Sequence, residues 1–130
     1  MRTLVVDDDL IARLLLIEFL LDYGTCESVV DGEEAVRAYR LAIQRNRAYD
    51  LILLDVMMPK MDGIEALSKI REIEKEHNIP PEKQVKIIMI SAKVDELTKE
   101  TAHTAECSAY LTKPVDHDEL VNKFTELKLI

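Results

Sequence analysis

The sequence predicts an α/β fold in which a doubly wound parallel sheet carries helices on both faces. Five short apolar segments, most of them unbroken by polar residues, alternate with segments whose apolar residues recur at helical spacing. Unbroken aliphatic runs are typical of strands covered on both faces. A regular alternation of strand and helix favours parallel strands joined by right-handed crossovers. We expect residues 1–130 to form one such domain, with no effector domain attached.

Each expected strand is a short apolar run. In chain order the strands are Thr3–Val6, Cys26–Val30, Leu51–Leu54, Val85–Ile90 and Ala109–Leu111. Four helices follow from periodic sets of apolar residues, which are Leu10, Ile11, Leu14, Leu15 and Phe19; Ala35, Val36, Tyr39 and Ile43; Ile64, Leu67, Ile70 and Ile73; and Leu120, Val121, Phe124 and Leu127. A further helix, Val94–Cys107, has few large apolar residues, so we expect it to be the least firmly packed.

Capping residues mark the helix starts. Asp31, Asp62 and Asp116 are each followed three residues later by a glutamate, a pattern typical of a helix N-terminus. Gly24 suits the end of the first helix. The segments 44–47 and 74–83 are expected to be lengthened surface loops, the second of them because it contains two consecutive prolines.

Polar side chains stand at the carboxyl ends of four expected strands. The aspartates Asp7–Asp9 follow the first strand, and Asp55 follows the third. Ser91 follows the fourth strand and Lys113 the fifth. In doubly wound parallel sheets, ligands bind beyond the carboxyl ends of the strands, where the strand order reverses. We therefore expect these acids, the hydroxyl and the amine to converge on one edge of the sheet.

This set of side chains suits phosphoryl transfer. Clustered carboxylates repel one another unless a cation lies among them, and oxygen ligands favour Mg²⁺ or Mn²⁺ over Zn²⁺. Lys113 and Ser91 can bind phosphoryl oxygens, and a carboxylate such as that of Asp55 is a nucleophile for phosphoryl groups. Each residue taken singly also has an ordinary explanation, since Asp9 and Asp62 suit helix caps. The convergence of all of them is what favours a functional site.

Composition and charge limit the classes of partner. The net charge of −8, with only 5% aromatic residues and no Trp, disfavours direct binding of nucleic acid. No apolar run approaches the length that spans a membrane. Cys26 and Cys107 have no second ligand at metal-binding spacing, so we expect two reduced thiols in a cytoplasmic protein.

Four sequence strings at the strand ends carry a resemblance to a known family. They are LVVDDD (Leu4–Asp9), LLDVMMPKMDG (Leu53–Gly63), MISAK (Met89–Lys93) and YLTKP (Tyr110–Pro114). Over essentially its whole length the chain resembles a receiver domain of two-component response regulators, of the stand-alone chemotaxis type. The resemblance implies a flavodoxin-like three-layer sandwich of five βα units with sheet order 2-1-3-4-5.

The resemblance also assigns the phosphoacceptor and the metal. It implies that Asp55 accepts a phosphoryl group from a histidine kinase or a phosphotransfer protein, in a Mg²⁺-dependent (or Mn²⁺-dependent) reaction that the domain itself catalyses. It implies that Asp7, Asp8, Asp55 and the carbonyl of Met57 hold the metal. The domain is then a signalling switch that catalyses its own phosphorylation and dephosphorylation, without turning over a separate substrate.

The remaining implied roles concern the phosphoryl group and the switch. Ser91 and Lys113 contact the phosphoryl group, and the family often has a cis peptide bond between this lysine and the following proline. Ser91 and Tyr110 change position on phosphorylation and remodel the face made by the fourth helix, the fifth strand and the fifth helix. The remodelled face is expected to alter the binding of a downstream protein, which the sequence does not identify. The same face is a candidate for phosphorylation-dependent dimerisation.

Two departures from the family stand out. Glu106 and Cys107 occupy positions where the family usually has Gly-Ala, which suggests different backbone angles in that turn. Met57 cannot hydrogen-bond an attacking water through its side chain, so we expect slow self-dephosphorylation. The three histidines, His77, His103 and His117, are expected to be surface residues, neither phosphodonors nor metal ligands.

Two other classes of function remain open at this point. A phosphohydrolase of the haloacid dehalogenase type would use Asp7 as its nucleophile, but usually needs a further acidic pair and a cap domain. A receiver-like module that binds partners without phosphorylation typically lacks the acid pair, the hydroxyl or the lysine, and this chain has all of them. The chain also suits either a stand-alone protein or a domain cut from a larger one.

Overall fold

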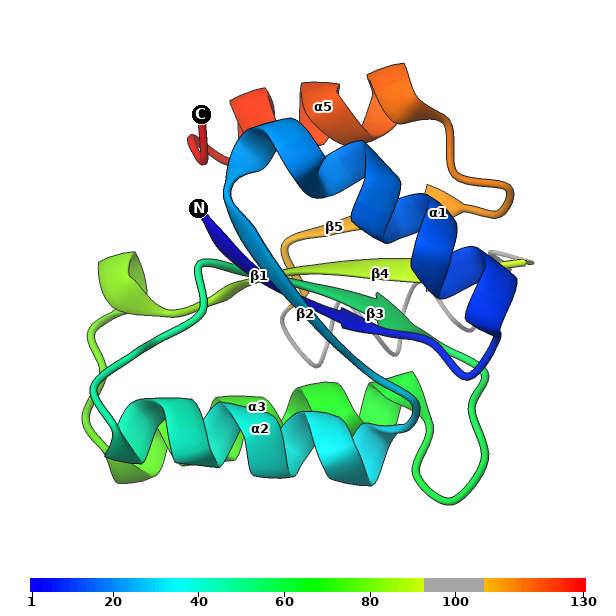
Figure 1. Ribbon diagram of the computed structural model, residues 1–130. Helices are drawn as coiled ribbons and strands as arrows, with labels where there is room; N and C mark the ends of the chain where they lie inside the picture. Colours follow the sequence, from blue (N-terminus) through cyan, green and yellow to red (C-terminus); the bar gives the residue numbers. More distant parts are fainter. Residues whose placement is uncertain (93–106) are drawn as a thin grey trace.

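The computed structural model describes residues 1–92 and 107–130. These residues form three layers, with a parallel sheet between two layers of helices (Figure 1). Apart from Cys107, the helix expected over Val94–Cys107 lies outside the described residues, and so does Glu106.

The sheet has five parallel strands in the order β2-β1-β3-β4-β5, which confirms the expected topology. The strands are β1 (Arg2–Val6), β2 (Thr25–Val29), β3 (Leu51–Asp55), β4 (Lys86–Ser91) and β5 (Ala109–Thr112). Their limits lie within about one residue of the expected ones, and both Asp55 and Ser91 are themselves the last residues of their strands. β1 and β3 are neighbours, so the strand order reverses between them, as the fold class requires.

Helices cover both faces of the sheet (Figure 1). On one side lie α1 (Leu10–Leu20) and α5 (His117–Glu126), and on the other lie α2 (Gly32–Gln44) and α3 (Gly63–Glu76). Two short 3-10 turns, η1 (Leu21–Tyr23) and η2 (Pro81–Lys83), complete the described elements. No helix in the described part of the chain has both the length and the apolar character that crossing a membrane requires.

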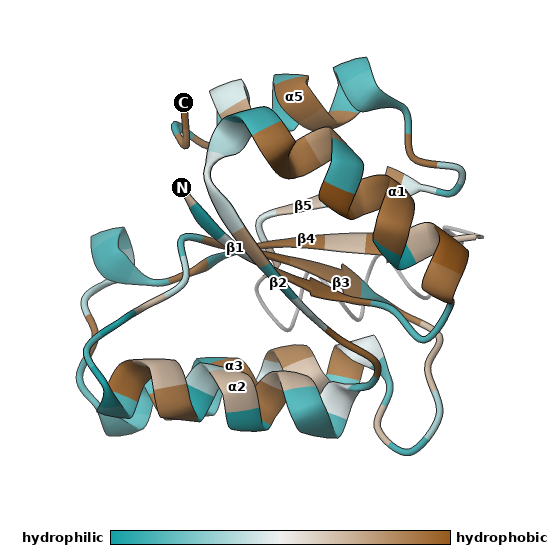
Figure 2. Cartoon of the chain, in the orientation of Figure 1, coloured by the Kyte–Doolittle hydropathy of each residue, from teal (hydrophilic) through white to brown (hydrophobic). Residues whose placement is uncertain are grey.

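Each face of the sheet has its own apolar core. Between the sheet and α2 and α3, the buried side chains include Leu4, Ile52 and Leu67. Between the sheet and α1 and α5, they include Leu53 and Phe124. The interiors of the central strands are therefore mostly apolar (Figure 2), and every residue of β3, including Asp55 at its end, is buried.

Two of the expected apolar surfaces are not fully buried. β2 lies at an edge of the sheet and most of its residues are exposed, so the expectation of cover on both faces is wrong for this strand. In α1 the buried residues are Leu16 and Leu20, whereas Ile11 is 70% exposed. The apolar residues that suggest α1 thus include exposed ones, among them Leu10 and Leu14. Much of the α1 ribbon is accordingly coloured as hydrophobic in Figure 2.

The expected helix starts are confirmed. The side chains of Asp31, Asp62 and Asp116 each accept a hydrogen bond from the backbone N–H of the glutamate three residues on. Asp9 caps α1, where its side chain accepts hydrogen bonds from the N–H groups of Ile11 and Ala12. Gly24 closes the 3-10 turn that extends α1, with a φ of 117° and no room for a Cβ atom beside Met1.

The expectation of a surface loop over 74–83 is wrong at its beginning. α3 continues to Glu76, and Glu74 is completely buried. Its carboxylate accepts hydrogen bonds from the Tyr39 hydroxyl at 2.8 Å, the Val85 N–H at 2.8 Å and the Arg71 guanidinium at 2.7 Å. These three hydrogen bonds compensate for the burial of the charge, and they link α2, α3 and the residue before β4.

Candidate functional site

The strand ends bring the expected polar residues to one edge of the sheet. Asp7 follows β1, Asp55 and Ser91 end β3 and β4, and Lys113 follows β5. Asp7, Asp55 and Ser91 are buried, with exposed fractions of 1%, 4% and 4%, although all three are polar. Buried polar groups of this kind need partners.

The Lys113 ammonium bridges the two buried acids. Its Nζ lies 2.9 Å from Asp7 Oδ2 and 3.4 Å from Asp55 Oδ1. Burial tends to lower the pKa of Lys113, but the hydrogen bonds and charges of Asp7 and Asp55 outweigh burial, so its pKa lies above the ordinary value. The Lys113–Pro114 peptide bond is cis, as the resemblance implied.

Burial and a neighbouring acid disfavour the charged form of Asp55. Its pKa is raised to about 6, first because it is buried and second because the charge of Asp7 is close. Lys113 and a backbone hydrogen bond from Met57 oppose this shift. The carboxylate would gain from a cation beside it, which is what a metal ion provides.

Asp7, Asp8 and Asp55 have the geometry of a cation site. One carboxylate oxygen from each lies within 4.8 Å of the others. Asp7 Oδ1 accepts the Asp9 N–H at 2.9 Å, and the contact that the described residues make with the buried Oδ2 is the ion pair with the Lys113 ammonium at 2.9 Å. Carboxylate oxygens that lack a full set of donors suit a hard cation such as Mg²⁺, so these residues fit the expected metal.

Two residues that support the site were not singled out from the sequence. The Arg13 guanidinium, in the second turn of α1, donates to the Asp7 carbonyl at 2.8 Å and fixes the turn between β1 and α1. A Cβ atom on Gly63 would lie 2.3 Å from the Asp55 carbonyl oxygen, so α3 can start against β3 only with glycine there. The Gly63 N–H donates to the Val56 carbonyl at 2.8 Å. The Asp-Gly pair in the sequence was the available signal for this close approach.

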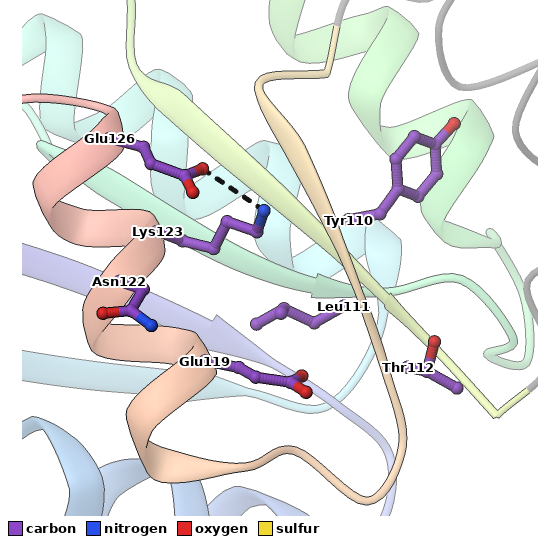
Figure 3. Close-up of a pocket in the computed structure, with 7 residues that line it drawn as sticks. All are labelled: Tyr110, Leu111, Thr112, Glu119, Asn122, Lys123 and Glu126. Carbon is purple, nitrogen blue, oxygen red and sulfur yellow. Dashed lines mark hydrogen bonds and ion pairs between the residues drawn. The ribbon is translucent and has the colours of Figure 1, made fainter.

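The expected switch residues lie on neighbouring strands. Ser91 pairs with Thr112 at the end of β4, and the Lys113 N–H donates to the Ser91 carbonyl at 2.8 Å. Tyr110 is half-buried and packs against the core on the α2 and α3 side. Figure 3 shows its ring on one side of β5 and the side chain of Leu111 on the other, toward α5.

The family model of the response regulator receiver domain matches residues 3–125. The chain belongs to this family. It is a receiver domain of the kind used in two-component signalling. It is 30% identical to the chemotaxis protein CheY of Treponema pallidum, over 97% of this chain and 81% of that protein. It is also 34% identical to the peroxide stress-activated histidine kinase mak2 of Schizosaccharomyces pombe, where the match covers 98% of this chain but only 5% of the kinase.

Solved structures of receiver domains share the fold. The receiver domain of the histidine kinase CKI1 from Arabidopsis thaliana, in complex with Mg²⁺ and BeF₃⁻, has a TM-score of 0.84 at 27% identity, covering 99% of this chain and 90% of that one. The receiver domain of the Saccharomyces cerevisiae response regulator Ssk1, crystallised with the phosphotransfer protein Ypd1, has a TM-score of 0.83 at 30% identity, covering 98% and 88%. Membership of the receiver family places the signalling function ahead of the phosphohydrolase alternative.

Proposed function

We propose that Asp55 is the phosphoacceptor of this receiver domain and that a histidine kinase or a phosphotransfer protein supplies the phosphoryl group. The observation that carries the proposal is the meeting of Asp7, Asp55 and Lys113 at one edge of the sheet. A carboxylate oxygen of Asp55 attacks phosphorus and forms a P–O bond. The P–N bond of the phosphohistidine breaks, and the imidazole nitrogen keeps the electron pair and takes up a proton.

Asp7, Asp8 and Asp55, with the carbonyl of Met57, are the proposed ligands of Mg²⁺ or Mn²⁺. The buried Asp7 Oδ2, whose contact among the described residues is the Lys113 ammonium, supports this ligand set. When bound, the metal neutralises charge on the acids and on the phosphoryl oxygens. The neighbouring CKI1 receiver structure, which contains Mg²⁺ with BeF₃⁻, supports the choice of ion.

Lys113 and Ser91 are the proposed phosphoryl contacts. The ammonium of Lys113 is anchored by acids on either side, so it can turn toward new negative charge on Asp55 while staying next to Asp7. Ser91 is buried at the adjacent strand end and presents a hydroxyl. These two donors stabilise the charge that develops on the phosphoryl oxygens, which is the main requirement of phosphoryl transfer.

The exposed apolar face of α1 is the proposed docking surface for the phosphodonor. Leu10, Ile11 and Leu14 are each more than half exposed. A hollow of about 320 Å³ separates this face from the segment after β5, and Asp7 and Lys113 are in its wall. An apolar helical surface of the donor, placed here, would hold its histidine beside the site. The complex of the Ssk1 receiver domain with Ypd1 supports a phosphotransfer protein as one such partner.

The proposed output surface includes β5 and α5. A hollow of about 280 Å³ lies between these elements, lined by Tyr110 and Leu111 and by α5 residues that include Lys123 and Glu126 (Figure 3). Inward movement of Ser91 and reorientation of Tyr110 would change this surface and thereby the binding of a downstream protein or of a second phosphorylated copy.

The cytoplasm, where kinases and phosphotransfer proteins of two-component systems act, is the proposed location.

The test of the proposed function is intact mass after incubation with acetyl phosphate and Mg²⁺, for wild type beside Asp55→Asn. The expected result is a gain of one phosphoryl group in the wild type, which needs Mg²⁺ and is absent from the variant. No gain in the folded wild type would instead support a module that binds partners without phosphorylation. A gain that persists in the variant would move the nucleophile to another residue, with Asp7 the first to examine.

A further inference from the structure

A groove lies on the outer side of the domain, at the open edge of the sheet. It has a volume of about 400 Å³ and runs between β2, the carboxyl half of α2 and the segment that leads into β3. We call it the β2–α2 groove. None of its lining residues belongs to the phosphorylation site. Its apolar part includes Leu4, Val29 and Ala38, and Leu41 at its rim is 44% exposed.

The groove is basic in a chain of net charge −8. Its lining includes Arg2, Arg45 and Arg47 but only one acid, Glu27. Arg2 is already engaged, because its guanidinium lies 3.1 Å from Glu27 and 4.2 Å from the centre of the Tyr49 ring. Tyr49 donates a hydrogen bond to the same Glu27 carboxylate. The Glu27 carboxylate therefore already has partners inside the groove, namely Arg2 and Tyr49.

Two of the arginines, Arg45 and Arg47, remain accessible to a ligand, although Arg47 is close enough to Glu27 for their charges to interact. Within residues 1–92 and 107–130, the guanidinium groups of Arg45 and Arg47 make no hydrogen bond or close ion pair. Both residues are exposed at the rim. An anionic group placed above the apolar floor would meet both charges.

The backbone of β2 offers a second means of recognition. Among the described strands β2 has β1 as its sole neighbour, so its other edge is open. The Val29 carbonyl accepts the Asp7 N–H at 3.3 Å and thus faces β1. Alternate residues of a strand direct their backbone groups to opposite sides, so the N–H and carbonyl of Ser28 face the open edge. Ser28 is one of the residues that line the groove.

We propose that the β2–α2 groove binds an extended acidic segment of a partner protein, which adds to β2 as a further strand. Its backbone would pair with Ser28, an aliphatic side chain would cover Leu41, and carboxylates would face Arg45 and Arg47. A small anion would contact the arginines but would leave the open strand edge and the apolar floor of the groove without a partner. A second copy of the chain would bring the same arginines into a symmetric contact, where like charges oppose one another.

The first test selects ligands without assuming their sequence. Phage-displayed random octapeptides are selected on the wild-type domain and counter-selected on the double variant Arg45→Glu/Arg47→Glu. The expected outcome is enrichment of peptides in which Asp or Glu alternates with Val, Ile or Leu. Failure to enrich any sequence over the counter-selection, or enrichment of sequences without acids, would overturn the proposal.

The second test asks whether the enriched peptide forms a strand. Ser28→Pro removes the outward N–H but leaves the pairing of β2 with β1 intact, because proline is tolerated on the open side of an edge strand. The affinity of the peptide, measured by fluorescence anisotropy, should fall by at least about tenfold in this variant and stay close to wild type in Ser28→Ala. An unchanged affinity in a folded Ser28→Pro variant would rule out strand addition.

A matched substitution on the same helix separates the two arginines from a general charge effect. Arg37 is exposed on α2 and does not line the groove, so Arg37→Glu changes the net charge by the same amount as Arg45→Glu. Peptide binding should weaken in Arg45→Glu and Arg47→Glu and persist in Arg37→Glu. Equal weakening in all three would mean that overall charge alone is responsible, and the groove would lose its role. Folding of each variant is checked by thermal melting.

Discussion

The Nζ of Lys113 lies 2.9 Å from Asp7 and 3.4 Å from Asp55, so one ammonium group balances two buried acids from different strands. The three residues are more than 45 positions apart at their closest in the sequence, and only the parallel topology brings them together. The arrangement makes the stability of the domain depend on what occupies the site.

Replacement of Lys113 by Met should expose this dependence. Without the ammonium the two carboxylates repel each other, so the free energy of unfolding in EDTA should fall by about 1–3 kcal/mol. Mg²⁺ should restore most of the loss, because the cation takes over the balancing charge. Urea denaturation with EDTA and with Mg²⁺ measures both quantities. Lys123→Met is the control, since the Lys123 ammonium forms a surface ion pair with Glu126 on α5, at 3.2 Å, and its loss should change stability by less than about 1 kcal/mol. An equal loss with and without Mg²⁺ would contradict the prediction.

The acyl phosphate should be long-lived because Met57 offers no polar side-chain atom to orient water. Its side chain is 73% exposed, so it can be replaced without disturbing the core. Met57→Gln should speed hydrolysis by at least about tenfold, the scale of a positioned polar group that orients the water. The measurement is decay of the phosphorylated mass after acetyl phosphate is removed. Met58→Gln, at the adjacent position, is the control, and a wild-type lifetime of seconds would contradict the prediction.

Glu74 should be among the most costly charged residues to remove. In Glu74→Ala, the Arg71 guanidinium and the Tyr39 hydroxyl would lose their buried acceptor, so the free energy of unfolding should fall by about 3–5 kcal/mol. Glu76→Ala is the control, because Glu76 is exposed and lies 3.4 Å from Arg40, a surface pair worth about 1 kcal/mol or less. Urea denaturation compares the two variants, and similar costs would argue against the buried network.

The thiol of Cys26 should react slowly at neutral pH. Burial, followed by the charge of Glu27, raises its pKa to about 11, against about 8.5 for a free thiol. In a Cys107→Ser background, alkylation by iodoacetamide at pH 8 should be at least about a hundredfold slower in the folded than in the urea-unfolded protein. Because the pKa of Cys26 is higher in the folded than in the unfolded protein, folding favours the neutral thiol. The contribution of this thiol to the free energy of unfolding is complete below its pKa in the unfolded protein and is lost as the pH rises toward 11. A folded protein that reacts at the unfolded rate would contradict the prediction.

The strand ends could be read from the sequence because a parallel sheet aligns them regardless of their distance along the chain. Asp7, Asp55 and Lys113 each follow an apolar run, and that position alone brought them to one edge. The helix caps at Asp31, Asp62 and Asp116 were equally predictable, since a cap depends on local backbone and side chain only.

Features that depend on tertiary context could not be read in the same way. Helical spacing places Glu74 on the apolar face of α3, four residues after Ile70, but it does not reveal that Tyr39 and Val85 supply the donors that allow a carboxylate to be buried there. The outward turn of Ile11 likewise depends on which face of α1 meets the sheet. The edge position of β2 was implicit in the expected strand order, whereas the contact of Arg13 with the Asp7 carbonyl depends on how α1 is placed against the sheet.

The close approach of Gly63 to Asp55 has a consequence for the loop between them. The Gly63 N–H bonds the Val56 carbonyl, so residues 56–63 form a loop that is closed at its base. Closing the base of the loop during folding therefore removes part of the conformational entropy of this segment before a metal ion binds. The backbone of Met57, whose carbonyl is a proposed metal ligand, lies next to the closed base of this loop. Insertions at its tip should be tolerated, whereas changes at its base should alter how the acid and the adjacent carbonyl share a cation.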